Sequence, residues 1–153
     1  MISAIVVTHN SEGVIEECLK SITQSDPQIK KEIIVFDNDS HDATVSTVKK
    51  FADSIRLISH ERNIGYGSAC NRAVQYSKGD YFVFLNADTK IVSDNFFSTL
   101  IRTSEKNVLC GIVGPKLINK DGTLQHSCGN FPSLARILVD RIAFLNRLVK
   151  GVL

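Results

Sequence analysis

The stretch Ala4-Ile5-Val6-Val7-Thr8-His9-Asn10 indicates the fold class, because four successive apolar residues run directly into polar ones. A strand of a parallel sheet is covered on both faces, so its apolar residues are consecutive rather than alternating. We therefore predict a first strand over residues 3–9. A second stretch, Ile33-Ile34-Val35-Phe36, has the same character and predicts a strand over residues 32–36.

Segments with helical periodicity lie between the predicted strands. Apolar residues recur at helical spacing from Val14 to Ile22, and Asn10 and Ser11 before them are typical helix N-cap residues. Further helices are predicted at residues 45–52, at 68–77 and after Ser93-Asp94, which would cap the last of these helices. Further strands are predicted at residues 55–59, 81–85 and 109–113. This alternation predicts an α/β domain with a mainly parallel sheet flanked by helices. Asp121-Gly122 adds a hairpin signal.

Composition narrows the class of protein. The chain has 153 residues, of which 43% are hydrophobic, and a net charge of +2 from 18 basic and 16 acidic residues. This balance fits one globular domain and gives no reason to expect a nucleic-acid partner. The four cysteines form no C-x-x-C pair, so we expect buried thiols rather than a zinc site. The sequence shows neither a signal peptide nor an apolar run long enough to span a membrane, which favours a cytoplasmic location.

Polar clusters follow four of the predicted strands. They are Thr8-His9-Asn10, Asp37-Asn38-Asp39-Ser40, Asn63 and Asn86-Ala87-Asp88. Ligands of open parallel sheets bind outside the carboxyl ends of the strands, where these clusters would meet. The clusters also have a purely structural interpretation. Asn10 and Ser11 could simply cap a helix, and residues 37–40 could simply form a turn, without binding a ligand.

The order of these clusters resembles that of a known enzyme family. The matching pieces are residues 4–10, 33–40, 63–72, 79–89, 113–117, 121–125 and 131–133. Together they are similar to the donor-binding part of an inverting family 2 glycosyltransferase with the GT-A fold, a Rossmann-like α/β arrangement. The Asn86-Ala87-Asp88 form resembles the rhamnosyltransferase-like branch, which acts in surface polysaccharide synthesis.

The resemblance implies a site for a nucleotide-diphosphate sugar. Thr8, His9, Asn10 and Asn38 would line the nucleoside pocket, and Asp37 would accept a hydrogen bond from the imide N–H of uracil or thymine, or from guanine. Asn63 would close over the nucleotide with Asn71 as a supporting contact, and Asn86 would take a ribose or water-mediated role. Asp88 would hold Mg²⁺ or Mn²⁺ against the diphosphate.

The resemblance also implies that the general base of the acceptor-binding half is missing from this chain. Such enzymes deprotonate the acceptor, a sugar or lipid-linked sugar, with a general base in the acceptor-binding half, and no residue here matches that motif. We therefore expect a truncated chain, with an incomplete donor-binding domain over residues 1–133. Residues 134–153 would form an amphipathic helix able to contact the inner face of a membrane.

Uncovered sheet edges would favour a homo-oligomer. The alternatives are a non-catalytic nucleotide-sugar-binding remnant and an interaction module.

Overall fold

A computed structural model of the chain describes residues 1–127. The chain divides into two compact units, Met1–Val113 and Gly114–Leu153, which are described separately. The predicted amphipathic helix at residues 134–153 and the thiol of Cys128 lie outside the described residues.

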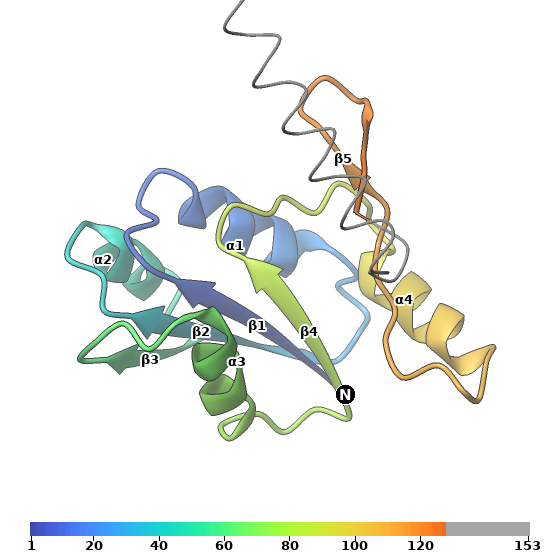
Figure 1. Cartoon of the computed structure of the whole chain (residues 1–153), viewed down its shortest axis with the longest axis horizontal. Coiled ribbons are helices and arrows are strands. Elements are labelled where there is room, and N and C mark those ends of the chain that lie inside the picture. The colour runs from blue at the N-terminus through green and yellow to red at the C-terminus, as the bar shows by residue number, and fades with distance from the viewer. Residues whose placement is uncertain (128–153) are drawn as a thin grey trace, which may run out of the picture. The chain divides into compact units, whose positions relative to one another are not determined.

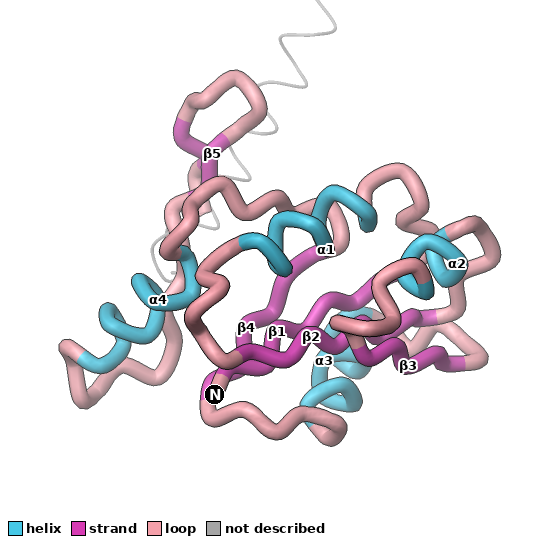
Figure 2. Tube along the Cα trace, turned by 180° about the vertical axis from the view of Figure 1, so that it is seen from behind, coloured by secondary structure: helices cyan, strands magenta, loops and turns pink. Residues whose placement is uncertain are grey.

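The first unit is built around a parallel sheet of four strands in the order β3-β2-β1-β4. The strands are β1 (Ile2–Thr8), β2 (Lys31–Asn38), β3 (Arg56–His60) and β4 (Tyr81–Asn86). The helices are α1 (Ile15–Gln24), α2 (Thr44–Lys49), α3 (Tyr66–Val74) and α4 (Phe96–Glu105). Figures 1 and 2 show α3 on one face of the sheet and α1 and α2 on the other. The predicted α/β architecture is therefore confirmed.

The central strand β1 explains why the sheet is covered on both faces. All seven of its residues are buried. Ala4 and Val6 belong to the hydrophobic cluster that includes Ile15 and Leu19 of α1, whereas Ile5 and Val7 belong to the cluster that includes α3. Consecutive apolar residues are thus needed because each face packs against a helix layer.

Polar residues end the strands at one edge of this sheet. The register pairs Thr8 of β1 with Asp37 of β2 and Val7 with Asn86 of β4, while Asn38 of β2 pairs with His60 of β3. Because all four strands run in the same direction, their polar ends are brought to the same edge. The predicted convergence of the four clusters is confirmed at the level of the backbone.

The strand predicted at residues 109–113 is wrong. These residues are irregular, and Val108, Leu109 and Ile112 are each at least 90% exposed. A strand needs a neighbour to pair its main-chain groups, and β4, the last strand on that side, pairs with β1 alone among the described residues. Residues 109–113 are therefore apolar but form no strand, because no neighbouring strand among residues 1–127 pairs with them.

The predicted side-chain caps are also wrong. Neither Asn10 nor Ser11 caps α1, whose N-cap position is Val14, and the carbonyl of Ser11 accepts the N–H groups of Val14 and Ile15. At α4 the N-cap position is Asn95 rather than Ser93 or Asp94, again without a side-chain cap.

The first turn of α4 is instead capped from a distance. The carboxylate of Asp26, which is fully buried between α1 and β2, accepts the N–H groups of Phe97 at 2.7 Å and Ser98 at 3.3 Å. A negative charge at a helix N-terminus is stabilising. A cap that comes from 71 residues away in the sequence leaves no local signal.

The second unit contains the predicted hairpin within its described part. Strand β5 (Leu117–Ile118) pairs antiparallel with β6 (Leu124–Gln125). Gly122 has a φ of +84°, a conformation that suits glycine, and its N–H donates to the carbonyl of Asn119 at 2.9 Å. The Asp121-Gly122 turn prediction is confirmed.

Three further features are described for residues 1–127. No helix in this range has the length and apolar character needed to cross a membrane. Cys18 and Cys70 are buried free thiols, and Cys110 is partly exposed. No group of three or more His, Cys, Asp or Glu side chains that could hold a metal ion is found in the same range.

Candidate functional site

A cleft of about 480 Å³ lies at the carboxyl edge of the parallel sheet. This volume is within the usual range for small-molecule sites. Seven of the nine site residues proposed from the sequence line it, namely Thr8, His9, Asn10, Asn38, Asn63, Asn86 and Asp88. They come from the ends of β1, β2 and β4 and from the segment between β3 and α3, so residues up to 80 positions apart share one hollow.

Two of the proposed residues do not line the cleft. Asp37 is only 3% exposed and lies behind the lining, where its Oδ1 accepts the hydroxyl of Thr8 at 3.0 Å and its Oδ2 accepts the N–H of Ser40 at 3.2 Å. Asn71 is exposed on α3, one position from Cys70 on the buried face of that helix. Asp37 therefore contacts the cleft through Thr8, whereas Asn71 is outside it.

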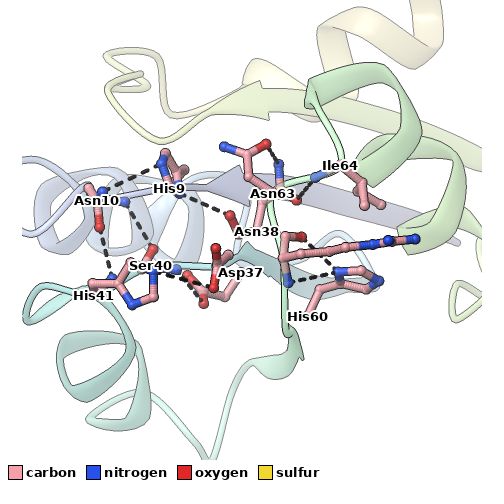
Figure 3. A network of polar contacts seen from close by, with 11 residues as sticks. His9, Asn10, Asp37, Asn38, Ser40, His41, His60, Asn63 and Ile64 are labelled. Carbon is pink, nitrogen blue, oxygen red and sulfur yellow. Dashed lines mark hydrogen bonds and ion pairs between the residues drawn. The ribbon is translucent and has the colours of Figure 1, made fainter.

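The loops after β1 and β2 are joined by hydrogen bonds that place Asn10 at the cleft (Figure 3). The N–H of Asn10 donates to Ser40 Oγ, and the N–H of His41 donates to Asn10 Oδ1, both at 2.9 Å. Asn10 and Asp39 have φ values of +49° and +72°. Asn and Asp tolerate this left-handed conformation better than other side chains, which explains their presence at the two turns.

A second set of hydrogen bonds joins β2 to the loop before α3. Asn38, 3% exposed, donates through Nδ2 to Asn63 Oδ1 at 2.8 Å and accepts the N–H of Ile64 through Oδ1 at 3.0 Å. Asn63 Oδ1 also accepts the N–H of Gly65 at 2.9 Å. The main-chain carbonyl of Asn38 contacts His9 Nδ1 at 2.9 Å. Asn38 is thus a buried junction between three segments of the cleft wall.

The β4 end of the cleft carries its acidic group. Asn86 and Asp88 are both exposed, and a turn follows the strand, with the N–H of Thr89 donating to the carbonyl of Asn86 at 3.0 Å. The thiol of Cys18 on α1 donates to the same carbonyl at 3.5 Å. Burial, together with the negative charge of Asp88, raises the pKa of Cys18 to about 12, so the thiol stays protonated and can donate.

The residues present suit a divalent cation that arrives with a phosphate ligand. Asp88 is a carboxylate, and Asn86 two residues earlier carries an amide oxygen, both of which are ligands that Mg²⁺ and Mn²⁺ accept. One or two carboxylates plus substrate phosphates are a common set for Mg²⁺. Because residues 1–127 hold no group of three His, Cys, Asp or Glu side chains that could bind a metal ion, a cation here would need further ligands from a bound molecule.

Sequence reasoning missed three lining residues that contribute apolar and hydroxyl surface, Ser11, Val14 and Tyr66. Tyr66 begins α3 between two glycines and is 48% exposed. Partial burial, with Cys70 nearby, raises the pKa of Tyr66 to about 12, so its phenol remains a hydrogen-bond donor at neutral pH. An aromatic residue between glycines at a loop–helix junction was the signal that could have identified it.

Several curated relatives of this chain carry the names of glycosyltransferases. The putative teichuronic acid biosynthesis glycosyltransferase TuaG of Bacillus subtilis is 29% identical over 127 residues, which are 80% of this chain and 50% of the relative. A second relative, the poly(ribitol-phosphate) beta-glucosyltransferase of Bacillus spizizenii, is 34% identical over 61% of this chain and 16% of the relative. The chain therefore spans half or less of the length of these relatives.

Solved structures resemble the chain at a similar level. TarS of S. aureus (residues 1–349) matches with a TM-score of 0.62 and 28% identity over 69% of this chain and 32% of that one. The mannosyltransferase PcManGT of Pyrobaculum calidifontis, solved with GDP-Man and Mn²⁺, matches with a TM-score of 0.63 and 28% identity over 66% of this chain and 31% of that one. The predicted GT-A-like fold is confirmed by these matches.

The match to a protein family covers nearly the whole chain. Residues 3–147 match the family described as Glycosyl transferase family 2. This range contains every residue of the cleft, from Val7 to Asp88. The chain belongs to glycosyl transferase family 2.

Proposed function

We propose that the cleft binds a nucleoside-diphosphate sugar, and that the chain provides the donor-binding part of a glycosyltransferase that makes a surface polysaccharide. The observation that carries the proposal is the chemical difference between the two ends of one cleft. Hydroxyl, imidazole and amide groups from β1, β2 and the loop before α3 form one end, and the carboxylate of Asp88 forms the other. A nucleoside and a metal-bound diphosphate require these two environments.

The comparisons support the class of ligand. A structure of TarS residues 1–349 was solved in complex with UDP-GlcNAc, and PcManGT with GDP-Man and Mn²⁺. The names of relatives include teichuronic acid biosynthesis and transfer of glucose to a diphosphoundecaprenol-linked sugar. By analogy, we propose a sugar or lipid-linked sugar as the acceptor. The rhamnosyltransferase-like branch stays a prediction.

In the proposed complex each end of the cleft has a defined role. Thr8, His9, Asn10 and Asn63 bind the nucleoside. Asp37, expected from the sequence to accept an imide N–H of the base, lies behind the lining and acts instead through Thr8, whose hydroxyl it holds at 3.0 Å.

Asp88 orients the diphosphate through a divalent cation, with Asn86 beside it. When bound, such an ion neutralises the charge that develops on a departing diphosphate. We assign no residue of the cleft lining as the general base for the acceptor hydroxyl.

A nucleotide-sugar-binding module without catalysis is the second candidate. The observation that favours it is that Asp88, assigned to the cation, is the one carboxylate among the residues that line the described cleft. Cytoplasmic location, membrane contact through residues 134–153 and self-association also stay predictions.

Calorimetric titration with UDP, GDP and TDP, with and without Mn²⁺, tests the proposed function. One nucleotide should bind clearly better than the others, and more tightly with Mn²⁺. Asp88→Asn should weaken the Mn²⁺-dependent binding at least about tenfold, because loss of even an outer-sphere metal contact costs that much. Asp53→Asn is a matched control, since Asp53 is exposed and does not line the cleft.

Weak binding that ignores both the base and the metal would contradict the proposal. A coupled assay of sugar transfer to a diphosphate-linked acceptor then separates the two candidates. Turnover supports an enzyme, and binding without turnover supports a binding module.

A further inference from the structure

The hydrogen bonds of the cleft wall fix the direction in which its amide side chains face. An amide has a donor end and an acceptor end, and a main-chain N–H can only donate. Asn63 Oδ1 accepts the N–H of Gly65, and Asn38 Oδ1 accepts the N–H of Ile64. Both amides therefore have a single orientation that satisfies their main-chain partners.

This orientation decides what Asn63 presents to a ligand. Because Oδ1 is held by Gly65 N–H and by Asn38 Nδ2, the Nδ2 group lies on the opposite side of the amide. Figure 3 shows the Asn63 oxygen turned toward Asn38. Asn63 lines the cleft and is exposed, so its Nδ2 is available there as a donor.

Asn38 orients His9 by the same logic. A main-chain carbonyl can only accept, so the contact between His9 Nδ1 and the carbonyl of Asn38 at 2.9 Å requires a proton on Nδ1. In the neutral ring Nε2 is then an acceptor, which agrees with Asn10 Nδ2 facing it at 3.4 Å. Asn10 itself is oriented by His41 N–H at its Oδ1.

We propose that Asn38 is a positioning residue that sets the hydrogen-bonding polarity of the cleft, holding Asn63 as a donor and His9 as an Nε2 acceptor. The inference rests on the proposed function and deepens it. The group that Asn63 recognises is an oxygen acceptor of the nucleoside, either a carbonyl of the base or a hydroxyl of the ribose. Asn38, at 3% exposure and with its amide engaged on both ends, acts through its neighbours.

Asn38→Asp tests the proposal with almost no change in shape. The introduced carboxylate still accepts Ile64 N–H but cannot donate to Asn63 Oδ1, and two acceptor oxygens then face each other. Asn63 relieves this by giving up its bond from Gly65 N–H and turning its Nδ2 toward the carboxylate, a charge-assisted hydrogen bond, so that it presents its oxygen to the cleft. We expect the affinity for UDP with Mn²⁺ to fall about tenfold, as for loss of one well-formed hydrogen bond against an unpaired acceptor. GDP or TDP replaces UDP if it binds more tightly.

A double-mutant cycle distinguishes positioning from a general loss of structure. In an Asn63→Ala background the Asn38→Asp substitution should change affinity less than about twofold, because the residue it acts on is gone. The same tenfold loss with and without the Asn63 side chain would overturn the proposal, as would wild-type affinity in Asn38→Asp. Comparing UDP with 2′-deoxy-UDP narrows the acceptor, since a smaller loss for the deoxy compound indicates the 2′-hydroxyl and an equal loss indicates the base or the 3′-hydroxyl.

A measurement without ligand keeps this inference separate from the proposed function. In ¹H–¹⁵N spectra of the free protein, the side-chain amide protons of Asn38 should exchange slowly with water and those of Asn63 rapidly. In the Asn38→Asp variant the Asn63 protons should become protected. Protected Asn63 protons in the wild type would overturn the proposal even if nucleotide binds, and the expected pattern would support it even if the tested nucleotides do not bind.

Discussion

The β1–β2–β3 end and the β4 end of the cleft are built differently. At the first end Asn10, Asn38 and Asn63 are fixed by hydrogen bonds between loops that follow three different strands. At the second end Asp88 is exposed, and it follows a strand whose residues Phe82 and Phe84 are 43% and 46% exposed. Under the proposed function, the difference predicts that the nucleoside end is formed before a ligand binds, whereas the metal end is completed by the ligand.

The contrast follows from the position of the strands in the sheet. β2 lies between β1 and β3, whereas β4 is the last strand on its side among the described residues. Phe36 of β2 is 1% exposed and Phe84 of β4 is 46% exposed, although both are phenylalanines on strands of one sheet. The two residues offer a direct way to compare the ends.

Phe36→Ala against Phe84→Ala is the comparison with the largest expected effect. Phe36→Ala should lower the free energy of unfolding by about 3–5 kcal/mol, because it leaves a cavity in the packed face under α3. Phe84→Ala should cost about 1 kcal/mol or less, since the ring is already partly in water. Urea unfolding followed by circular dichroism measures both. Equal losses of unfolding free energy in the two variants would show that β4 is as well packed as β2 and would contradict the difference between the two ends.

Ser40→Ala addresses the preformed nucleoside end and should have an intermediate effect. Ser40 Oγ accepts the N–H of Asn10, so its removal should cost about 1 kcal/mol of stability and loosen the loop after β1. The free energy of nucleotide binding should become less favourable by a similar amount, while the dependence of binding on Mn²⁺ is kept. Ser46→Ala is a control, because Ser46 on α2 donates to the carbonyl of Ala43, away from the cleft. A change in the Mn²⁺ dependence alone would argue that the two ends are not separate.

The dependence of the unfolding free energy on acid pH should come from Glu32, at the opposite edge of the sheet, and should be the smallest of the three effects. Burial alone would raise the pKa of Glu32, but hydrogen bonds from Ser3 and from the main chain of Lys78 and Gly79 lower it below its usual 4.5. A lowered pKa means that Glu32 stabilises the fold above about pH 4.5 and loses this contribution as the pH falls through its folded-state pKa.

The measurement is the unfolding free energy of wild type and Glu32→Gln between pH 7 and pH 3. The difference should be largest at pH 7, smaller than the Ser40 effect, and should shrink below pH 4.5. A difference that grows as the pH falls would contradict the sign of the shift.

Consecutive apolar residues made most of the fold predictable. The stretches at residues 4–7 and 33–36 proved to be β1 and β2, buried on both faces, and polar residues marked the edge where the cleft lies. The strand expected at residues 109–113 failed because pairing depends on a neighbour that a local pattern does not specify. The capping of α4 by Asp26 was likewise set by tertiary structure.

The site was predictable in location but not in the role of each side chain. Motif order placed seven of the proposed residues in one cleft. It could not show that Asp37 lies behind Thr8 or that the Asn38 amide is engaged by Asn63 and Ile64, because both depend on which face of β2 each side chain occupies. Asn71 matched a motif but lies on the exposed side of α3.

Paramagnetic broadening by Mn²⁺ in ¹H–¹⁵N spectra tests the central claim most directly, because it locates ion and nucleotide in the same experiment. With UDP, or whichever nucleoside diphosphate binds best, Mn²⁺ should broaden the signals of residues 86–89, while the nucleotide shifts those of residues 8–10 and 63–66. Without nucleotide, Mn²⁺ should have little effect at residues 86–89. Broadening centred elsewhere in the chain, or nucleotide shifts that avoid residues 8–10 and 63–66, would contradict a shared cleft with a preformed nucleoside end and a ligand-completed metal end.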